Sequence, residues 1–194
     1  KKIGAVNFVI KEKGLWTGKN TDWLGFSAPF LLNTNKNQFK MNNIINPIVL
    51  GYGGASKAII YALKVNGVKN IKIYNRTYEK IENLRKQKII PIQKDEIEEN
   101  ILKTNLIINT TPTNIIKREL TKLKKNRGKI KHIKGYDIVY KPKETEFLSY
   151  FLKKNRYYGL EMLVNQAAPC FENWLKKKPK ISKKLYIFLN RHLS

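Results

Sequence analysis

The stretch "PIVLGYGGASKAIIYALKVNG" (residues 47–67) decides the fold. Its first residues form a short apolar run, which is typical of a buried strand. Three glycines, Gly51, Gly53 and Gly54, follow within four residues, and apolar residues then recur at helical spacing. A second apolar run, "VKNIKIYNRT" (residues 68–77), comes next. We therefore predict a strand, a glycine turn, a helix and a second strand, which together form a βαβ unit.

The glycine turn indicates a site for a dinucleotide cofactor. A phosphate reaches backbone N–H groups only where no Cβ atom obstructs it. Gly51 would permit the tight turn, Gly53 the close approach of the phosphate, and Gly54 with Ala55 the close packing of the helix on the strand. The usual fingerprint ends with Gly or Ala, where this chain has Ser56. The alternative is a glycine turn that serves packing alone.

The end of the second strand favours NADP over NAD. An NAD site usually has Asp or Glu at this point, to bind the ribose hydroxyls. This chain has Asn75, Arg76 and Thr77 instead, with Lys80 shortly after. Arg76 can pair with a 2′-phosphate and stack on adenine. The alternative is that Arg76 only caps a surface turn.

The alternation of strands and helices continues to the end of the chain. Strand-like runs are predicted at residues 89–93, 105–112 and 134–140, and helices at 77–88, 94–104, 143–155, 160–175 and 181–193. Such repetition predicts an α/β fold with a doubly wound, Rossmann-like parallel sheet covered on both faces. The polar stretch at residues 32–46 is the predicted boundary or loop.

Composition limits the class of protein. The chain has 194 residues, of which 42% are hydrophobic, so we expect one or two compact domains. The formal net charge of +25 would suit a nucleic acid or an anionic membrane. The lysines are spread along the whole chain, however, so we interpret them as a general Lys/Ile/Asn bias and expect neither partner. The single cysteine, Cys170, excludes an internal disulfide and fits a cytoplasmic setting. His132 and His192 are far apart in sequence, and we expect no metal site.

Asp22 opens an otherwise apolar segment, "GKNTDWLGFSAPFLL" (residues 18–32). One interpretation is helix capping, because side-chain oxygens accept from the free N–H groups of a first turn. The other is that Asp22 handles a proton at a cleft.

Seven motifs, in order, resemble the shikimate dehydrogenase family over residues 3–179. They are "IGAVN" (3–7), "NTDWLGF" (20–26), "VLGYGGAS" (49–56), "IYNRT" (73–77), "IINTTP" (107–112), "YDIVYKPKET" (136–145) and "GLEMLVNQAAPCFENW" (159–174). The resemblance implies NADP-dependent, reversible reduction of 3-dehydroshikimate to shikimate, in aromatic amino-acid biosynthesis. It also implies a cofactor domain beside a separate α/β substrate domain.

The resemblance also implies roles for particular residues. Asp22 corresponds to the catalytic aspartate, and substrate would be bound by Asn7, Asp22, Tyr140 and Gln166. The cofactor would be bound by Gly51, Tyr52, Gly53, Gly54, Ala55, Asn75, Arg76, Thr77, Lys80, Ile138, Gly159 and Met162. Trp23 stands where the family often has Gly. The implied organisation is a remnant of the substrate domain (1–22), a connecting helix and loop (23–46), the NADP domain (47–158) and C-terminal helices that return toward the substrate domain (159–194).

The sequence departs from the family in one respect. The family's catalytic lysine lies in a motif like "NVTxPxK", and its carboxylate-binding serines lie further upstream; this sequence contains neither. We therefore expect an N-terminally truncated chain that keeps NADP binding and has weak or no turnover. The alternatives are a quinate/shikimate dehydrogenase that uses NAD, a noncatalytic NADP-binding module or subunit, and a basic nucleic-acid-binding protein. We expect a monomer or homodimer.

Overall fold

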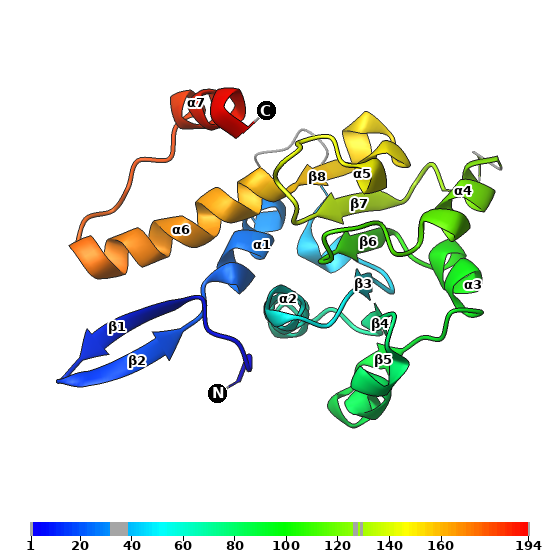
Figure 1. Cartoon of the computed structure of the whole chain (residues 1–194), viewed down its shortest axis with the longest axis horizontal. Coiled ribbons are helices and arrows are strands. Elements are labelled where there is room, and N and C mark those ends of the chain that lie inside the picture. The colour runs from blue at the N-terminus through cyan, green and yellow to red at the C-terminus, as the bar shows by residue number, and fades with distance from the viewer. Residues whose placement is uncertain (1, 32–38, 126–127, 129, 194) are drawn as a thin grey trace.

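The computed structural model describes residues 2–31, 39–125, 128 and 130–193, and its centre is a six-stranded parallel sheet (Figure 1). The sheet order is β5-β4-β3-β6-β7-β8, so the chain starts in the middle and winds outward in both directions. The strands are β3 (Ile48–Leu50), β4 (Lys72–Tyr74), β5 (Ile90–Pro91), β6 (Leu106–Asn109), β7 (Lys134–Asp137) and β8 (Arg156–Tyr158). The predicted doubly wound α/β class is confirmed.

Helices cover both faces of this sheet (Figure 1). The α-helices are α1 (Asp22–Leu31), α2 (Gly54–Val65), α3 (Ile97–Leu102), α4 (Lys117–Lys125), α5 (Glu146–Ser149), α6 (Gly159–Leu175) and α7 (Lys183–Leu193). Short 3₁₀ segments are η1 (Met41–Asn43), η2 (Tyr78–Lys80), η3 (Glu82–Gln87) and η4 (Lys153–Asn155). Each face of the sheet has its own apolar core, and strand side chains alternate between the two.

Helix α1 belongs to one of these cores. Phe26 and Phe30 on α1 are buried together with Tyr136 and Tyr157 of the sheet. The Phe26 and Tyr136 ring centroids are 5.0 Å apart, and those of Phe30 and Tyr157 are 5.1 Å apart. Met41 and Ile44, beyond the helix, join the same core, whereas residues 32–38 of the predicted connecting segment lie outside the described residues. Helix α1 therefore packs as part of the sheet's cover.

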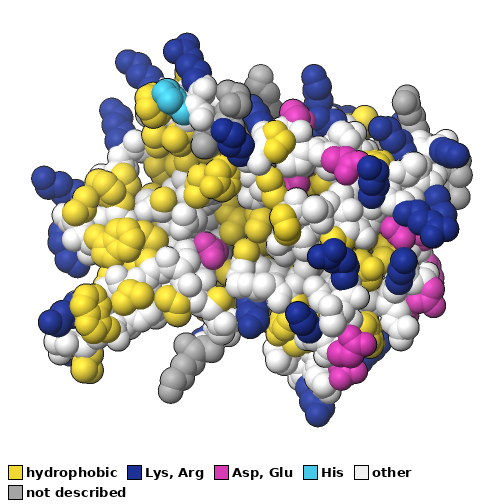
Figure 2. All heavy atoms as spheres, viewed as in Figure 1, with side chains coloured by type: hydrophobic (Ala, Val, Ile, Leu, Met, Phe, Trp, Pro, Cys, Tyr) yellow, Lys and Arg dark blue, Asp and Glu magenta, His cyan; other side chains and the backbone are white. Residues whose placement is uncertain are grey.

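A two-stranded antiparallel hairpin, β1 (Phe8–Glu12) and β2 (Leu15–Lys19), lies apart from the main sheet (Figure 1). Phe8 and Ile10 are buried with Cys170 of α6. The Trp174 indole Nε1 donates to the Val9 carbonyl oxygen at 2.9 Å. The hairpin is thus attached to the second half of α6, and the space-filling view shows apolar side chains over this part of the molecule (Figure 2).

Several elements differ from the prediction. The hairpin, α4 and β8 were not predicted. The predicted helix at 77–88 is two short 3₁₀ segments, because within it only Ile81 and Leu84 are buried, and Lys88 ends the segment in the left-handed region, at φ 59°. The predicted helix at 143–155 is reduced to α5 and η4. No helix in the described part of the chain is long and apolar enough to cross a membrane.

Candidate active site

The glycine turn lies where β3 meets α2. Gly51 has φ +94°, and a Cβ there would lie 2.6 Å from Thr111 Cγ2 and 2.9 Å from Thr110 Oγ1. Glycine is therefore required at this position both by backbone conformation and by the turn that follows β6. Gly53 is the N-cap of α2, and a Cβ there would meet nothing within 4 Å. Free N–H groups at the start of α2 thus border open space, which an anion can enter.

The residues after β4 lie beside this turn, because β4 pairs with β3 and Leu50 is opposite Tyr74. Asn75 donates from Nδ2 to the Thr77 carbonyl oxygen at 2.8 Å, which closes a tight bend. Arg76, Thr77 and Lys80 are exposed. Among the described residues, no carboxylate forms an ion pair with Arg76. Its guanidinium is therefore available to an anionic group on a ligand.

Tyr52 and Ala55 complete the predicted cofactor loop. Tyr52 is partly buried, and the Lys57 ammonium lies 5.3 Å from the centroid of its ring. Ala55 is in the first turn of α2. Both residues therefore lie next to the glycines, at the carboxyl edge of the sheet.

A second group of predicted cofactor residues meets at the end of β7. A Cβ on Gly159 would lie 2.2 Å from the Ile138 carbonyl oxygen, so the start of α6 is pressed against the chain that leaves β7. Met162 is buried one turn further along α6. Tyr140 follows in the same loop and is 41% exposed. In the described part of the chain, Tyr140 has no hydrogen bond to Asn7, Asp22 or Gln166, so the structure does not join it to the other predicted substrate residues.

The loop after β7 is held by a buried carboxylate. Asp137 accepts from Thr145 Oγ1 at 2.6 Å, from the Val139 backbone N–H at 3.1 Å and from Asn109 Nδ2 at 3.1 Å. Burial raises the pKa of Asp137, and these hydrogen bonds act in the opposite direction. The carboxylate therefore ties both ends of the loop that carries Ile138 and Tyr140.

Three predicted substrate residues form one hydrogen-bonded cluster. Asn7 Nδ2 lies 2.8 Å from Asp22 Oδ1 and 3.1 Å from Gln166 Oε1. They come from three different elements, since Asn7 precedes β1, Asp22 begins α1 and Gln166 lies on α6. Asn7 and Gln166 are 159 positions apart in sequence. We call Asn7, Thr21, Asp22 and Gln166 the amide–carboxylate cluster.

Close packing of α1 on α6 brings this cluster together. A Cβ on Gly25 would lie 2.5 Å from the Met162 carbonyl oxygen and 2.8 Å from Gln166 Cβ. Only a residue without a side chain allows the two helices to approach so closely. Gly25 was not among the predicted site residues, although it is part of the quoted motif "NTDWLGF". It determines how near Asp22 lies to Gln166.

The carboxylate of Asp22 points into the cluster. It accepts a hydrogen bond from the Asn7 side-chain amide, whereas the Asp22 backbone N–H at the start of α1 donates to Asn20 Oδ1 at 3.0 Å. The capping oxygen is thus supplied by Asn20. Burial raises the pKa of Asp22, against the lowering effect of hydrogen bonds from Asn7 and Asn20. Among the residues that the structure describes, no cation forms an ion pair with this carboxylate.

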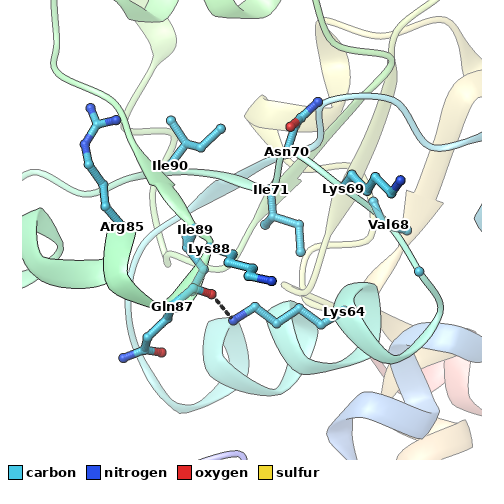
Figure 3. A pocket seen from close by; sticks show the side chains of 11 residues that line it. Lys64, Val68, Lys69, Asn70, Ile71, Arg85, Gln87, Lys88, Ile89 and Ile90 are labelled. Carbon is cyan, nitrogen blue, oxygen red and sulfur yellow. Dashed lines mark hydrogen bonds between the residues drawn. The ribbon is translucent and has the colours of Figure 1, made fainter.

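A large hollow lies at the opposite edge of the sheet, between the last turn of α2, the start of β4 and the end of η3 (Figure 3). Its volume is about 830 Å³, and its lining includes Lys64, Lys69, Arg85 and Lys88. Lys64 Nζ donates to the Gln87 carbonyl oxygen at 2.7 Å. Cations at these two helix ends complement the partial negative charge of terminal carbonyls. The positive charge that lines the hollow is therefore explained by the ends of α2 and η3. The hollow is remote from the amide–carboxylate cluster.

Comparison with known proteins decides the family. Residues 32–146 match the sequence profile of the family described as "Shikimate / quinate 5-dehydrogenase". The chain belongs to this family. The predicted resemblance is therefore confirmed.

The curated relatives are longer than this chain. A shikimate dehydrogenase (NADP(+)) from Dictyoglomus thermophilum is 36% identical over 186 residues, which cover 90% of this chain and 63% of the relative. One from Nitrosopumilus maritimus is 36% identical over 180 residues, with 89% and 63% covered. The chain thus spans about 63% of the length of these members of the family.

Solved structures of the family match the fold. A chorismate mutase/shikimate 5-dehydrogenase fusion protein from Clostridium acetobutylicum has a TM-score of 0.76 at 32% identity, covering 99% of this chain and 69% of that one. Shikimate 5-dehydrogenase from Thermus thermophilus, in complex with NADP(H) and shikimate, has a TM-score of 0.72 at 25% identity, with 92% and 65% covered.

Proposed function

We propose that this chain acts in the NADP-dependent, reversible reduction of 3-dehydroshikimate to shikimate. The observation that carries the proposal is the convergence of Asn7, Asp22 and Gln166 in one cluster. Each of them corresponds to a substrate or catalytic residue through the family resemblance. The names of the curated relatives and the NADP(H) and shikimate of the Thermus complex support the same reaction.

The cofactor end of the site suits a phosphorylated dinucleotide. Open space at Gly53 would admit the pyrophosphate to the N-terminus of α2. Arg76, exposed and without a carboxylate partner among the described residues, would pair with the 2′-phosphate. When bound, the cofactor supplies or accepts the hydride. Quinate dehydrogenase from Corynebacterium glutamicum in complex with NAD is also a structural neighbour, so cofactor preference separates the two activities.

The amide–carboxylate cluster would bind and orient the substrate's oxygen atoms. The Asp22 carboxylate accepts from a substrate hydroxyl, and its raised pKa favours exchange of a proton with that oxygen. Asn7 Nδ2 donates to the same carboxylate, at Oδ1, and orients it. In the family, this aspartate is expected to work with a lysine from a motif that the present sequence lacks. We therefore propose that this chain binds NADPH and turns over slowly.

The cofactor proposal is tested by titrating the chain with NADPH and with NADH, followed by nucleotide fluorescence. Arg76→Ala is expected to weaken NADPH binding roughly 10- to 100-fold, because a charge-assisted contact is lost, and to change NADH binding little. Arg85→Ala is the matched control, since Arg85 is also exposed but lines the remote hollow. Equal losses for both nucleotides, or no loss, would contradict the assignment of Arg76.

The catalytic proposal is tested by measuring shikimate oxidation with NADP⁺. We expect slow turnover by the chain alone and faster turnover when the part of a relative that this chain does not match is supplied as a second polypeptide. Turnover typical of a complete enzyme by the chain alone would refute the slow-turnover proposal. NADPH binding with no recovery would favour a noncatalytic NADP-binding module.

A further inference from the structure

We propose that Thr21 is a positioning residue of this site. Its backbone N–H fixes the Asn7 side-chain amide, and its buried hydroxyl holds the Gln166 amide in the orientation that leaves the two Gln166 Nε2 hydrogens for a bound substrate. This inference rests on the proposed function for its substrate, but the orientation of the two amides is a property of the chain itself.

Thr21 lies at the centre of the amide–carboxylate cluster and is 4% exposed. Its Oγ1 accepts from Asn7 Nδ2 at 2.9 Å and lies 3.4 Å from Gln166 Oε1 and 3.2 Å from Cys170 Sγ. One hydroxyl thus touches residues from before β1 and from two turns of α6. Because it is shielded from water, these contacts are not exchanged for solvent.

The backbone of Thr21 fixes the Asn7 amide. The Thr21 backbone N–H donates to Asn7 Oδ1 at 2.9 Å, so this oxygen must face Thr21. A flipped amide would bring an NH₂ group against that N–H and leave both donors without an acceptor. Asn7 Nδ2 is therefore directed at Thr21 Oγ1, Asp22 Oδ1 and Gln166 Oε1. The two hydrogens of Asn7 Nδ2 cannot satisfy all three acceptors at once. One of the three acceptor oxygens therefore needs a second donor.

The hydroxyl of Thr21 is that donor for Gln166. Gln166 Oε1 faces both Asn7 Nδ2 and Thr21 Oγ1, so its carbonyl oxygen is held on the inside of the cluster. The opposite side of the amide, Nε2, has no hydrogen-bond partner within the described ranges. Its two hydrogens are available to an oxygen of a bound polyol or ketone. Without the Thr21 hydroxyl, Gln166 loses one of the two donors that select this orientation.

The test compares Thr21→Val, which keeps the shape and removes the hydroxyl, with Thr21→Ser, which keeps the hydroxyl. The ligand-free readout is water exchange of the Asn7 side-chain amide by NMR, because its hydrogens are bound inside the cluster and Thr21 Oγ1 is one of their acceptors. We expect Thr21→Val to accelerate this exchange at least tenfold and Thr21→Ser to change it less than threefold. Thr104→Val is the matched control, because Thr104 is a buried threonine whose hydroxyl bonds remote backbone groups.

The second readout is shikimate affinity in the presence of saturating NADP⁺. Thr21→Val is expected to weaken shikimate binding about 5- to 30-fold and to leave NADP⁺ affinity unchanged, while Thr104→Val alters neither. Unchanged amide exchange in Thr21→Val would overturn the inference, as would equal effects of Thr21→Val and Thr104→Val. If the wild-type chain binds neither NADP⁺ nor shikimate, the proposed function fails, and amide exchange still decides the role of Thr21.

Discussion

Asp22 carries a negative charge in a partly buried position where no cation among the described residues offsets it. Its pKa in the folded chain is raised by burial, from an ordinary value of 3.8. Below pH 3.8 the carboxyl group is mostly neutral in both the folded and the unfolded states. As the pH rises through the folded pKa, the folded state must accept a poorly solvated charge, so the contribution of this group to stability is lost.

We therefore predict that Asp22→Asn is more stable than the wild-type chain at pH 7. The difference should shrink as the pH falls toward 3.8, because the wild-type carboxyl then becomes neutral as well. Urea unfolding of both chains at pH 7 and near pH 3.8 measures this difference in the free energy of unfolding. Comparing the variant with the wild type at the same pH cancels the contributions of other titrating groups. An Asp22→Asn chain that is less stable at pH 7 would show that the charged form is favoured in the fold.

Gly51 and Gly53 give a matched pair of substitutions in one turn. Gly51→Ala should destabilise the fold by about 1–3 kcal/mol, because Gly51 has φ +94° and its Cβ would meet Thr111. Gly53→Ala should leave stability within about 0.5 kcal/mol, because its Cβ meets only open space. We expect Gly53→Ala to weaken NADPH binding by more than tenfold, since the methyl group occupies the approach of a phosphate. Thermal melts and nucleotide titrations separate these effects, and unaltered NADPH binding by Gly53→Ala would place the phosphate elsewhere.

At the residue scale, the sequence was informative where chemistry restricts the residue type. The glycines and the Asn7, Asp22 and Gln166 motifs were recognisable because few residues can replace them. Thr21 and Gly25 were missed, because a threonine before an aspartate or a glycine in a helix has many common explanations. Their importance depends on α6 lying opposite them, which is a property of the tertiary structure.

At the scale of elements, the packing of α1 on α6 controls the site. A Cβ on Gly25 would lie 2.5 Å from a carbonyl oxygen of α6, and a backbone atom cannot rotate away as a side chain can. We predict that Gly25→Ala destabilises the chain by about 1–3 kcal/mol and moves Asp22 away from Gln166. Ala28→Gly is the control for the position of Asp22, because it destabilises the same helix by about 1 kcal/mol without adding a methyl group against α6. Urea unfolding and the Gln166 side-chain amide shift measure the two consequences; a Gly25→Ala chain as stable as wild type would contradict the close approach.

The elements that the sequence did not predict, and α5, which it predicted too long, are short or weakly patterned. Strand β8 has three residues and α5 has four, so neither is long enough to establish a hydrophobic period. Helix α4 is dominated by lysines, and only Leu120 and Leu123 supply apolar contacts to the core. The long periodic segments α2 and α6 were predicted well. The hairpin depends on contacts with Trp174 and Cys170, which lie more than 150 positions away in sequence.

At the scale of the whole molecule, charge opposes compactness. The net charge is +25, and lysine and arginine side chains surround the visible face (Figure 2). Like charges repel one another in the folded state, and salt screens this repulsion. We predict that the melting temperature rises as NaCl is increased from 20 to 500 mM. Within this range the Debye length falls below about 10 Å, so the repulsion between surface lysines is screened.

Replacing Lys177 and Lys178, both exposed beyond α6, with Glu should raise the low-salt melting temperature and reduce the response to NaCl. A salt response equal to that of the wild type would show that repulsion is not the cause. The same surface will attract nucleic acid non-specifically at low salt. Only nucleic-acid binding that persists at 200 mM NaCl would therefore indicate a specific site. We expect no such persistence.

Helix α1 has a consequence for motion. Its first residue, Asp22, belongs to the amide–carboxylate cluster, and its later turns place Phe26 and Phe30 in the core of the sheet. A hinge between the carboxylate and the sheet would have to break that aromatic contact. The hairpin is held in the same way, because it is attached to α6 through Trp174 and Cys170. Carboxylate, hairpin and sheet should therefore move as one body when a ligand enters or leaves.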